Sequence, residues 1–272
     1  MVLQPIFRRA SRSASLSPDR LWCSSELYQK CAFRHLCQRI TMASSARLKS
    51  FTDRYPYLGP LIWVATLEYF VVQYVVAANW PSPYSLLRNP ISDLGNTGCG
   101  VYDGRQVCSP NYPLMNLAFV GLGVLMVVGA PLIHQEFRER RLATLGFCGM
   151  AIAGLGTVLV GLAPENVNLT VHMLGAAGPF VVGNVALIIL SCTLMMSTSV
   201  RVVTGLAGGI GLAGLFLFAL GADLGLGQGG MERVAAYPQT IWLIIFGVYM
   251  SKNRYLKRRR MRRDISLDGS AA

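Results

Sequence analysis

The sequence predicts an all-α fold, a bundle of six membrane-spanning helices with both termini in the cytoplasm. Three observations predict this. Hydrophobic residues make up 53% of the 272 residues and charged residues only 14%, whereas soluble domains carry roughly 25% charged residues. Six apolar stretches approach or exceed the roughly 20 residues that a helix needs to cross a bilayer. Basic residues gather in alternate connecting segments, as in the cytoplasmic loops of membrane proteins.

The apolar runs place the six predicted spans. Every connecting segment holds charged or turn-forming residues, which favours six separate spans. The start of the last span is the least well defined, because Pro238 lies near it. The predicted spans cover residues 57–79, 114–133, 142–162, 171–195, 202–220 and 235–250. The chain is therefore divided into a basic extension (1–54), a membrane domain (55–250) and a basic tail (251–272).

The first 41 residues differ from the rest of the chain. They are rich in Arg and Ser, and their acidic residues are Asp19 and Glu26. This composition is typical of an organelle transit peptide. The alternative is that translation starts at Met42 rather than at Met1. Under either interpretation the segment lies outside the predicted bundle.

The net charge of +12 follows a membrane topology and does not predict nucleic-acid binding. Six spans place residues 43–56, the segments after the second and fourth spans, and the tail on one side of the membrane, and basic residues gather there. The connecting segments on the opposite side hold only Arg88, Arg105 and Arg233. The segment between the first two spans is therefore predicted to be extracytoplasmic. Basic residues beside a bilayer attract anionic lipid head groups, so membrane lipid is the expected partner. The plasma membrane is favoured over an organelle membrane.

Cys99 and Cys108 share this first extracytoplasmic loop. Disulfides persist on that side of a membrane, so we predict a disulfide between them; two free thiols are the alternative. Gly98, Gly100 and Gly104 would let the loop turn tightly. The expected purpose is to stiffen the loop rather than to perform redox chemistry.

Glycines recur within the third, fourth and fifth spans, for example Gly146 and Gly149, Gly175 and Gly178, and Gly205 and Gly208. Small residues three or four positions apart let helices approach closely in lipid. The three spans are therefore predicted to pack tightly together. A homodimer through these faces is an alternative use of the same pattern.

Polar residues gather at two depths of the predicted bundle. Within the spans they are Glu68, Asn116 and Asn184; at the extracytoplasmic face they are Ser92, Asp93, Asn96, Glu165, Asn166 and His172. A polar group inside a bilayer needs a partner or a purpose. The deeper set is interpreted as an interhelical hydrogen-bond network or as part of a ligand or proton path.

Ser, Asp and His on one face also suggest a hydrolase. Neither outer serine, however, has a nucleophile-elbow sequence. A capping or hydrogen-bonded role for His172 and a turn-forming role for Asp93 are the structural alternatives. His172 is the only histidine on this face, so a zinc site is not predicted. The spans also lack the paired histidines that haem ligation requires, so no cofactor is predicted.

Several of these motifs together resemble one membrane family. They are the sequence NPISDLGN at residues 89–96, Cys99 and Cys108, and the Pro-Glu-Asn turn at 164–166 followed by His172. Over residues 55–250 the chain resembles the family called domain of unknown function 998. The resemblance implies a multi-span integral membrane protein and implies no reaction. Asn111 departs from the pattern, since many relatives have His there, so a site that needs two histidines would lack one here.

Three functional hypotheses follow. The first is binding of a lipid or small polar ligand at the extracytoplasmic face, with the nine polar residues named above as the site. The second is a membrane-embedded hydrolase or transferase that acts on a lipid, with Asp93 and His172 as catalytic acid–base groups. The third is a small proton-coupled transporter that uses Glu68. The sequence shows no inverted repeat that would support transport.

Overall fold

The computed structural model describes residues 46–137 and 140–268, so nearly all of the N-terminal extension, with its alternative start sites, lies outside the described residues. Residues 48–272 form one compact unit; of the other unit, residues 1–47, only 46 and 47 are described, and both are helical. The described chain contains six helical spans long and apolar enough to cross a membrane, which confirms the predicted multi-pass fold. On which side the termini lie stays a prediction.

The spans follow their predicted ranges closely, except at the start of the sixth. The first consists of α2 (Leu58–Val64), the 3-10 turn η2 (Ala65–Leu67) and α3 (Glu68–Ala78). The second and third are α4 (Tyr112–His134) and α5 (Arg141–Leu162). The fourth consists of α6 (Leu169–Ala177), the π-helical turn η4 (Gly178–Gly183) and α7 (Asn184–Thr193). The fifth is α8 (Thr198–Ala219), and the sixth lies in α9 (Gly227–Asp268).

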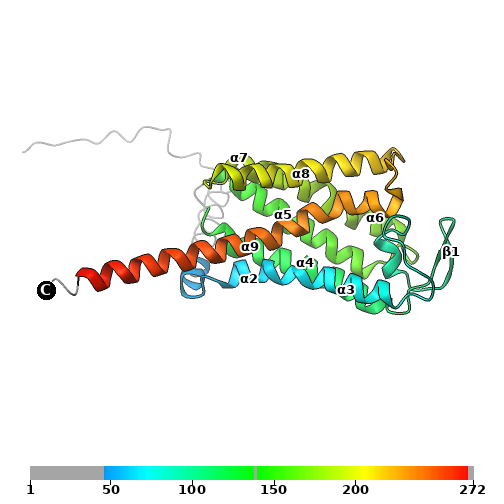
Figure 1. Ribbon diagram of the computed structural model, residues 1–272, viewed down its shortest axis with the longest axis horizontal. Coiled ribbons are helices and arrows are strands. Elements are labelled where there is room, and N and C mark those ends of the chain that lie inside the picture. Colours follow the sequence, from blue (N-terminus) through cyan, green and yellow to red (C-terminus); the bar gives the residue numbers. More distant parts are fainter. Residues whose placement is uncertain (1–45, 138–139, 269–272) are drawn as a thin grey trace, which may run out of the picture. The chain divides into compact units, whose positions relative to one another are not determined.

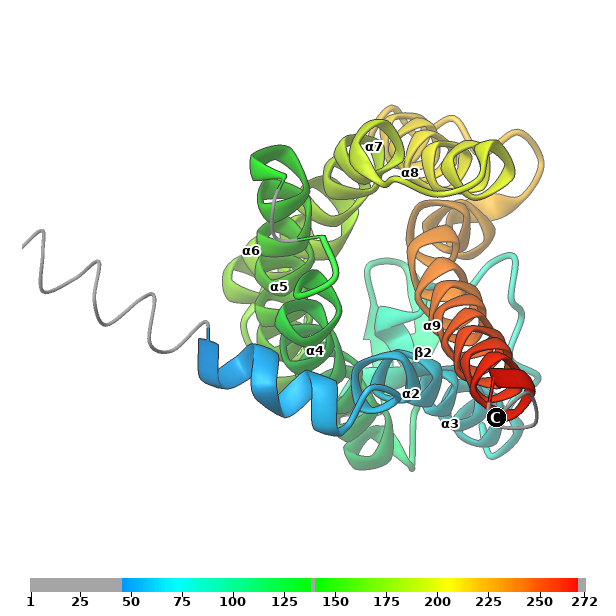
Figure 2. The ribbon, with the colours of Figure 1, turned by 90° about the vertical axis from the view of Figure 1, so that its left-hand side faces the viewer.

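The six spans form a closed ring. Each packs against its neighbours in sequence, and α9 completes the ring by packing against α2 (Figure 2). Between the first two spans lie the 3-10 turn η3 (Ser92–Gly95) and the antiparallel strands β1 (Gly100–Tyr102) and β2 (Arg105–Val107). These elements lie at one end of the bundle, called here the hairpin end, and α9 extends beyond the other end (Figure 1).

Aromatic side chains fill the ring interior beside α2. Trp63 is fully buried, and its ring centroid lies 5.6 Å from that of Trp242 and 5.9 Å from that of Phe246. The Trp242 indole donates a hydrogen bond to Thr204 Oγ1 at 2.8 Å, so its N–H is satisfied although buried. Aromatic rings therefore fill the interior around Trp63.

The sixth span begins at Gly227 rather than at residue 235, which corrects the predicted boundary. Residues 227–234 contain glycines, Glu232 and Arg233, which resemble a loop in sequence. In the structure both charged residues lie in α9 and are buried against partners on the segment between the first two spans. Pro238 lies inside α9 and does not end it.

Glycines bring neighbouring spans into backbone contact, as the sequence predicts for the third to fifth spans. A Cβ at Gly175 would lie 2.8 Å from the Gly156 carbonyl oxygen, and one at Gly208 would lie 2.6 Å from the Asn184 carbonyl oxygen. Gly154 lies equally close to Gly123, so the second span also uses this packing. These faces are used within the chain. A homodimer through the same spans stays a prediction.

The fourth span widens into a π-helical turn at its middle. Pro179 has no backbone N–H and therefore cannot complete the regular α-helical ladder. The Asn184 side-chain amide donates to the Phe180 carbonyl at 2.9 Å and to the Ala235 carbonyl of α9 at 3.2 Å. Asn184 therefore supports the wide turn and joins the fourth span to the sixth.

Candidate functional site

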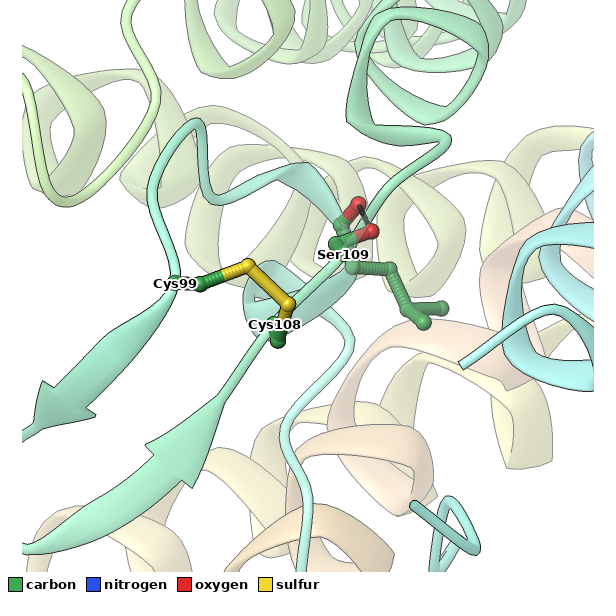
Figure 3. Close-up of a disulfide and its surroundings, with 4 residues drawn as sticks. Cys99, Cys108 and Ser109 are labelled. Atoms are coloured by element: carbon green, nitrogen blue, oxygen red, sulfur yellow. Dashed lines mark hydrogen bonds between the residues drawn. A yellow bond between two sulfur atoms is a disulfide. The ribbon is translucent and has the colours of Figure 1, made fainter. Parts of the chain in front are cut away.

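A disulfide joins Cys99 to Cys108 at the hairpin end, as predicted (Figure 3). The two cysteines flank the strand pair, in which Gly100 pairs with Val107. Gly104, in the connecting turn, has a φ of 72°, which favours glycine. The two-stranded hairpin itself was not predicted. Its effect is to hold the loop in one shape.

The segment 89–96 folds over the hairpin end of the ring and is called here the lid. Its residues Ile91, Leu94 and Asn96 are buried. Ser109 Oγ donates to the Leu94 carbonyl at 2.7 Å (Figure 3), and the Asn116 amide donates to the Gly95 carbonyl at 2.9 Å. These bonds hold the lid from the hairpin side and from α4.

The sixth span holds the other edge of the lid. The Arg233 guanidinium donates to the Asn89 carbonyl at 2.8 Å, to the Leu86 carbonyl at 2.9 Å and to the Tyr84 hydroxyl at 2.6 Å. Glu232 accepts a hydrogen bond from the Ile91 N–H. Adjacent residues of α9 therefore fix the backbone on both sides of Pro90.

A cavity of about 50 Å³ lies beneath the lid. Since a buried water needs roughly 10–15 Å³ measured in this way, the cavity has room for a few waters or one small polar group. Its walls come from the lid and from the first, second, third, fourth and sixth spans. The apolar lining includes Ile91, Phe119, Leu122, Met126, Val160, Ala176, Pro179, Phe180 and Ala236, and the polar lining includes Ser92, Thr157, His172, Glu232, Gln239 and Thr240.

Three of the polar lining residues form a hydrogen-bonded triad. Ser92 Oγ lies 3.2 Å from His172 Nε2 and 3.2 Å from Glu232 Oε1. His172 Nδ1 lies 2.9 Å from the Ala163 carbonyl oxygen. His172 and Glu232 are only 4% and 6% exposed. The triad thus joins the lid, the fourth span and the sixth span at one point.

Asp93, the neighbour of Ser92, has a different partner. Its carboxylate is fully buried and accepts hydrogen bonds from Arg105 Nε at 3.3 Å and from Arg105 Nη2 at 3.2 Å. Arg105 also donates to Asp103 at 2.8 Å and to Gln228 at 3.0 Å. This buried ion pair suits a structural role for Asp93 in holding the hairpin against the lid.

The remaining sequence-predicted residues are not among those that line the cavity. The Asn166 side chain forms two hydrogen bonds with Thr97, at 3.0 and 3.2 Å. The Asn96 side chain is buried with no hydrogen-bond partner in the described part of the chain. Glu68 is half-buried where the first span passes Gly121 of α4. Of the nine predicted site residues, Ser92 and His172 line the cavity.

Sequence reasoning missed the part of the site that comes from α9. Glu232, Gln239 and Thr240, with Ala236 between them, all line the cavity. Their spacing of four, seven and eight residues from Glu232 places them on one face of a helix. This signal is present in the sequence, but the predicted start at residue 235 separated Glu232 from the others.

Comparison with known proteins identifies the family. A family model described as a protein of unknown function, DUF998, matches residues 63–249, more than half of the chain. The chain belongs to the DUF998 family. No curated protein and no solved structure matches this DUF998 chain. The match runs from the first span to the sixth, so it includes the lid, the disulfide and all three triad residues.

Within the described residues, no group of three or more His, Cys, Asp or Glu could hold a metal ion.

Glu165 is expected to make the stability of this DUF998 member depend on pH. Burial and the nearby negative charge of Asp93 raise the pKa of its carboxyl from 4.5 to about 8. Between these values the folded chain binds more protons than the unfolded chain, so its stability falls as pH rises. From pH 5 to pH 8.5 a shift of this size corresponds to about 4 kcal/mol. We therefore expect the melting temperature in detergent to fall by roughly 10 °C through this group.

The variant Glu165→Gln isolates this contribution, because the amide stays neutral throughout the range. Its melting temperature is expected to vary less with pH than that of the wild type and to be higher at pH 8.5. Asp223→Asn, at an exposed carboxyl of the same end, is the control and should keep the wild-type slope. An unchanged slope in Glu165→Gln contradicts the assignment.

Proposed function

We propose that this protein binds the polar part of a membrane lipid in the cavity beneath the lid, at the extracytoplasmic face. The observation that carries the proposal is the Ser92–His172–Glu232 triad in the wall of a small, otherwise mainly apolar cavity. Binding sites for small molecules commonly combine apolar walls with a few convergent polar groups. The distribution of Lys and Arg supports the extracytoplasmic assignment.

The size of the cavity supports a restricted ligand. A volume of about 50 Å³ suits a hydroxyl or ester group rather than a whole head group. Both hydrogen-bond donors and acceptors are available there. A serine hydroxyl can donate and accept, and the histidine and carboxyl groups donate or accept according to whether they carry a proton. The apolar residues on either side suit the hydrocarbon that adjoins such a group in a lipid.

Native mass spectrometry of the full chain, released gently from its membrane, tests the proposal. We expect the wild type to retain a lipid and Ser92→Ala to retain roughly 5- to 10-fold less, the effect of losing about one hydrogen bond. Ser82→Ala is the matched control, since Ser82 is exposed in the same connecting segment. The lipid is identified from its mass after release.

Two results would contradict the proposal. One is a wild-type protein that carries no lipid although its disulfide is formed and its thermal transition is intact. The other is a lipid that Ser92→Ala and Ser82→Ala retain equally well. Thermal unfolding of both variants is measured alongside, so that a loss of lipid through unfolding is recognised.

A further inference from the structure

We propose that Ser92 is a nucleophile that takes an acyl group from a lipid ester, with His172 as its general base. The inference rests on the proposed function, because the ester must first bind in the same cavity. Ser92 Oγ lies 3.2 Å from His172 Nε2, within the range expected for a nucleophile and its base. His172 is in turn oriented by a third group, the Ala163 carbonyl. Both reacting residues line the cavity.

The hydrogen-bond partners determine where the proton of His172 lies. A carbonyl oxygen only accepts, so Nδ1 must carry a hydrogen to bond with Ala163. In a neutral imidazole Nε2 is then bare and accepts from the Ser92 hydroxyl. This is the arrangement that a general base requires.

The same reasoning assigns a role to Glu232. If the Ser92 hydroxyl donates to His172, then the contact between Ser92 Oγ and Glu232 Oε1 needs a hydrogen from Glu232. A neutral His172 therefore pairs with a protonated Glu232. An ionised Glu232 would instead accept from Ser92 and leave His172 as an imidazolium, which cannot act as a base. Glu232 is thus a positioning residue that selects the reactive arrangement.

The surroundings hold Ser92 in place for such a reaction. Its neighbours Ile91 and Asp93 are both buried, one with its N–H bound to Glu232 and the other paired with Arg105. Gln239 lines the same cavity, and its amide donates only to Met126 Sδ, at 3.9 Å, among the described residues. Sulfur is a weak acceptor, so this amide is available to an ester carbonyl oxygen.

The proposed reaction has two balanced steps. Ser92 Oγ bonds to the ester carbonyl carbon and passes its proton to His172 Nε2. The bond from that carbon to the alcohol oxygen breaks, and the alcohol leaves with the proton from His172. Water then bonds to the acyl carbon and passes a proton to His172 Nε2. The bond from that carbon to Ser92 Oγ breaks, Ser92 Oγ takes the proton from His172, and the carboxylic acid is released. A second lipid alcohol in place of water makes the reaction a transfer.

A fluorophosphonate probe tests the nucleophile directly, since Ser92 Oγ bonds to phosphorus and fluoride leaves. The full chain in detergent is treated with the probe, and the modified residue is located by mass spectrometry of its peptides. We expect the adduct on Ser92 in the wild type. His172→Gln should label at least about 100-fold more slowly, the lower end of general-base contributions. His134→Gln, at the other end of the bundle, should label at the wild-type rate.

Glu232 provides a test that separates its positioning role from a purely structural one. In Glu232→Gln the amide N–H can donate to Ser92 Oγ while the amide oxygen accepts from the Ile91 N–H, so labelling should stay within a few-fold of the wild type. Glu232→Leu supplies neither bond and should label at least 10-fold more slowly. Equal labelling of the two variants contradicts the assigned role.

The outcomes also separate this inference from the proposed function. A retained lipid with no adduct on Ser92 contradicts acyl transfer and leaves lipid binding supported. If the protein has an intact thermal transition but neither retains a lipid nor forms an adduct on Ser92, both proposals are contradicted. An adduct that forms equally fast in His172→Gln overturns the role of His172. Release of p-nitrophenol from an acyl ester, greater in the wild type than in Ser92→Ala, is expected if the whole cycle operates.

Discussion

Arg105→Met is expected to lower the free energy of unfolding by about 3 kcal/mol or more, because it leaves a buried carboxylate without its cation. Asp93 is fully buried, and both of its oxygens accept hydrogen bonds from Arg105. The amide of Asn89, at 3.5 Å, is too distant to replace them. Thermal unfolding in detergent, with matched protein and lipid concentrations, measures the effect.

Arg88→Met is the control, because Arg88 is exposed in the same connecting segment. It should change the melting temperature little. The double variant Asp93→Asn, Arg105→Met removes both charges and should recover much of the stability that Arg105→Met loses. If Arg105→Met proves no more destabilising than Arg88→Met, the ion pair does not stabilise the fold.

The same comparison separates two roles for Asp93. As an acid–base group it would affect a reaction while leaving stability nearly unchanged. As the partner of Arg105 it affects stability first. The geometry favours the second role, since the Asp93 carboxylate is bonded to Arg105 whereas His172 is bonded to Ser92.

The spans and the position of the lid could be predicted because they depend on local composition. A run of about 20 apolar residues is a property of one segment, and so is the turn-rich sequence of residues 89–96. Ser92 and His172 were likewise predictable as polar residues that the topology places on one face. Each of these inferences needs the order of the spans and nothing about their side-chain contacts.

Glu232 could not be predicted as a site residue in the same way, because its place in the site depends on a hydrogen bond to Ser92, 140 residues away in the sequence. Adjacent Glu and Arg residues after several glycines resemble a loop, and only the packing of α9 against the lid satisfies them inside a helix.

For Asn116 and Asn184, one of the two interpretations made from the sequence was a hydrogen-bond network between helices. In the structure their side-chain amides donate to backbone carbonyls of neighbouring segments, in agreement with that interpretation.

Gly156→Ala is expected to destabilise the bundle by about 1–3 kcal/mol and to displace α6 from α5. A Cβ at Gly156 would lie 2.9 Å from Gly178 Cα and would overlap the Gly175 carbonyl oxygen. Both of these obstacles are backbone atoms, so no side-chain rotation relieves the contact. The gain in helix propensity from Gly to Ala, up to about 1 kcal/mol, offsets only part of the cost.

Gly209→Ala is the matched control, since a Cβ at Gly209 meets no atom of the described residues within 4 Å. It should leave the melting temperature unchanged or raise it slightly. Comparison of the two variants by thermal unfolding therefore separates close packing from helix propensity. Equal melting temperatures would show that the fourth span accommodates the methyl group without strain.

The effect of Gly156→Ala should also reach the triad. His172 lies one turn before Gly175 on α6, the helix that the new methyl group displaces. A shift of this helix lengthens the 3.2 Å contact between His172 Nε2 and Ser92 Oγ, although neither residue is changed. Fluorophosphonate labelling of Ser92 should therefore slow in Gly156→Ala, measured below its melting temperature, and not in Gly209→Ala. Loss of stability without slower labelling would mean that the helix yields elsewhere and keeps the histidine in place.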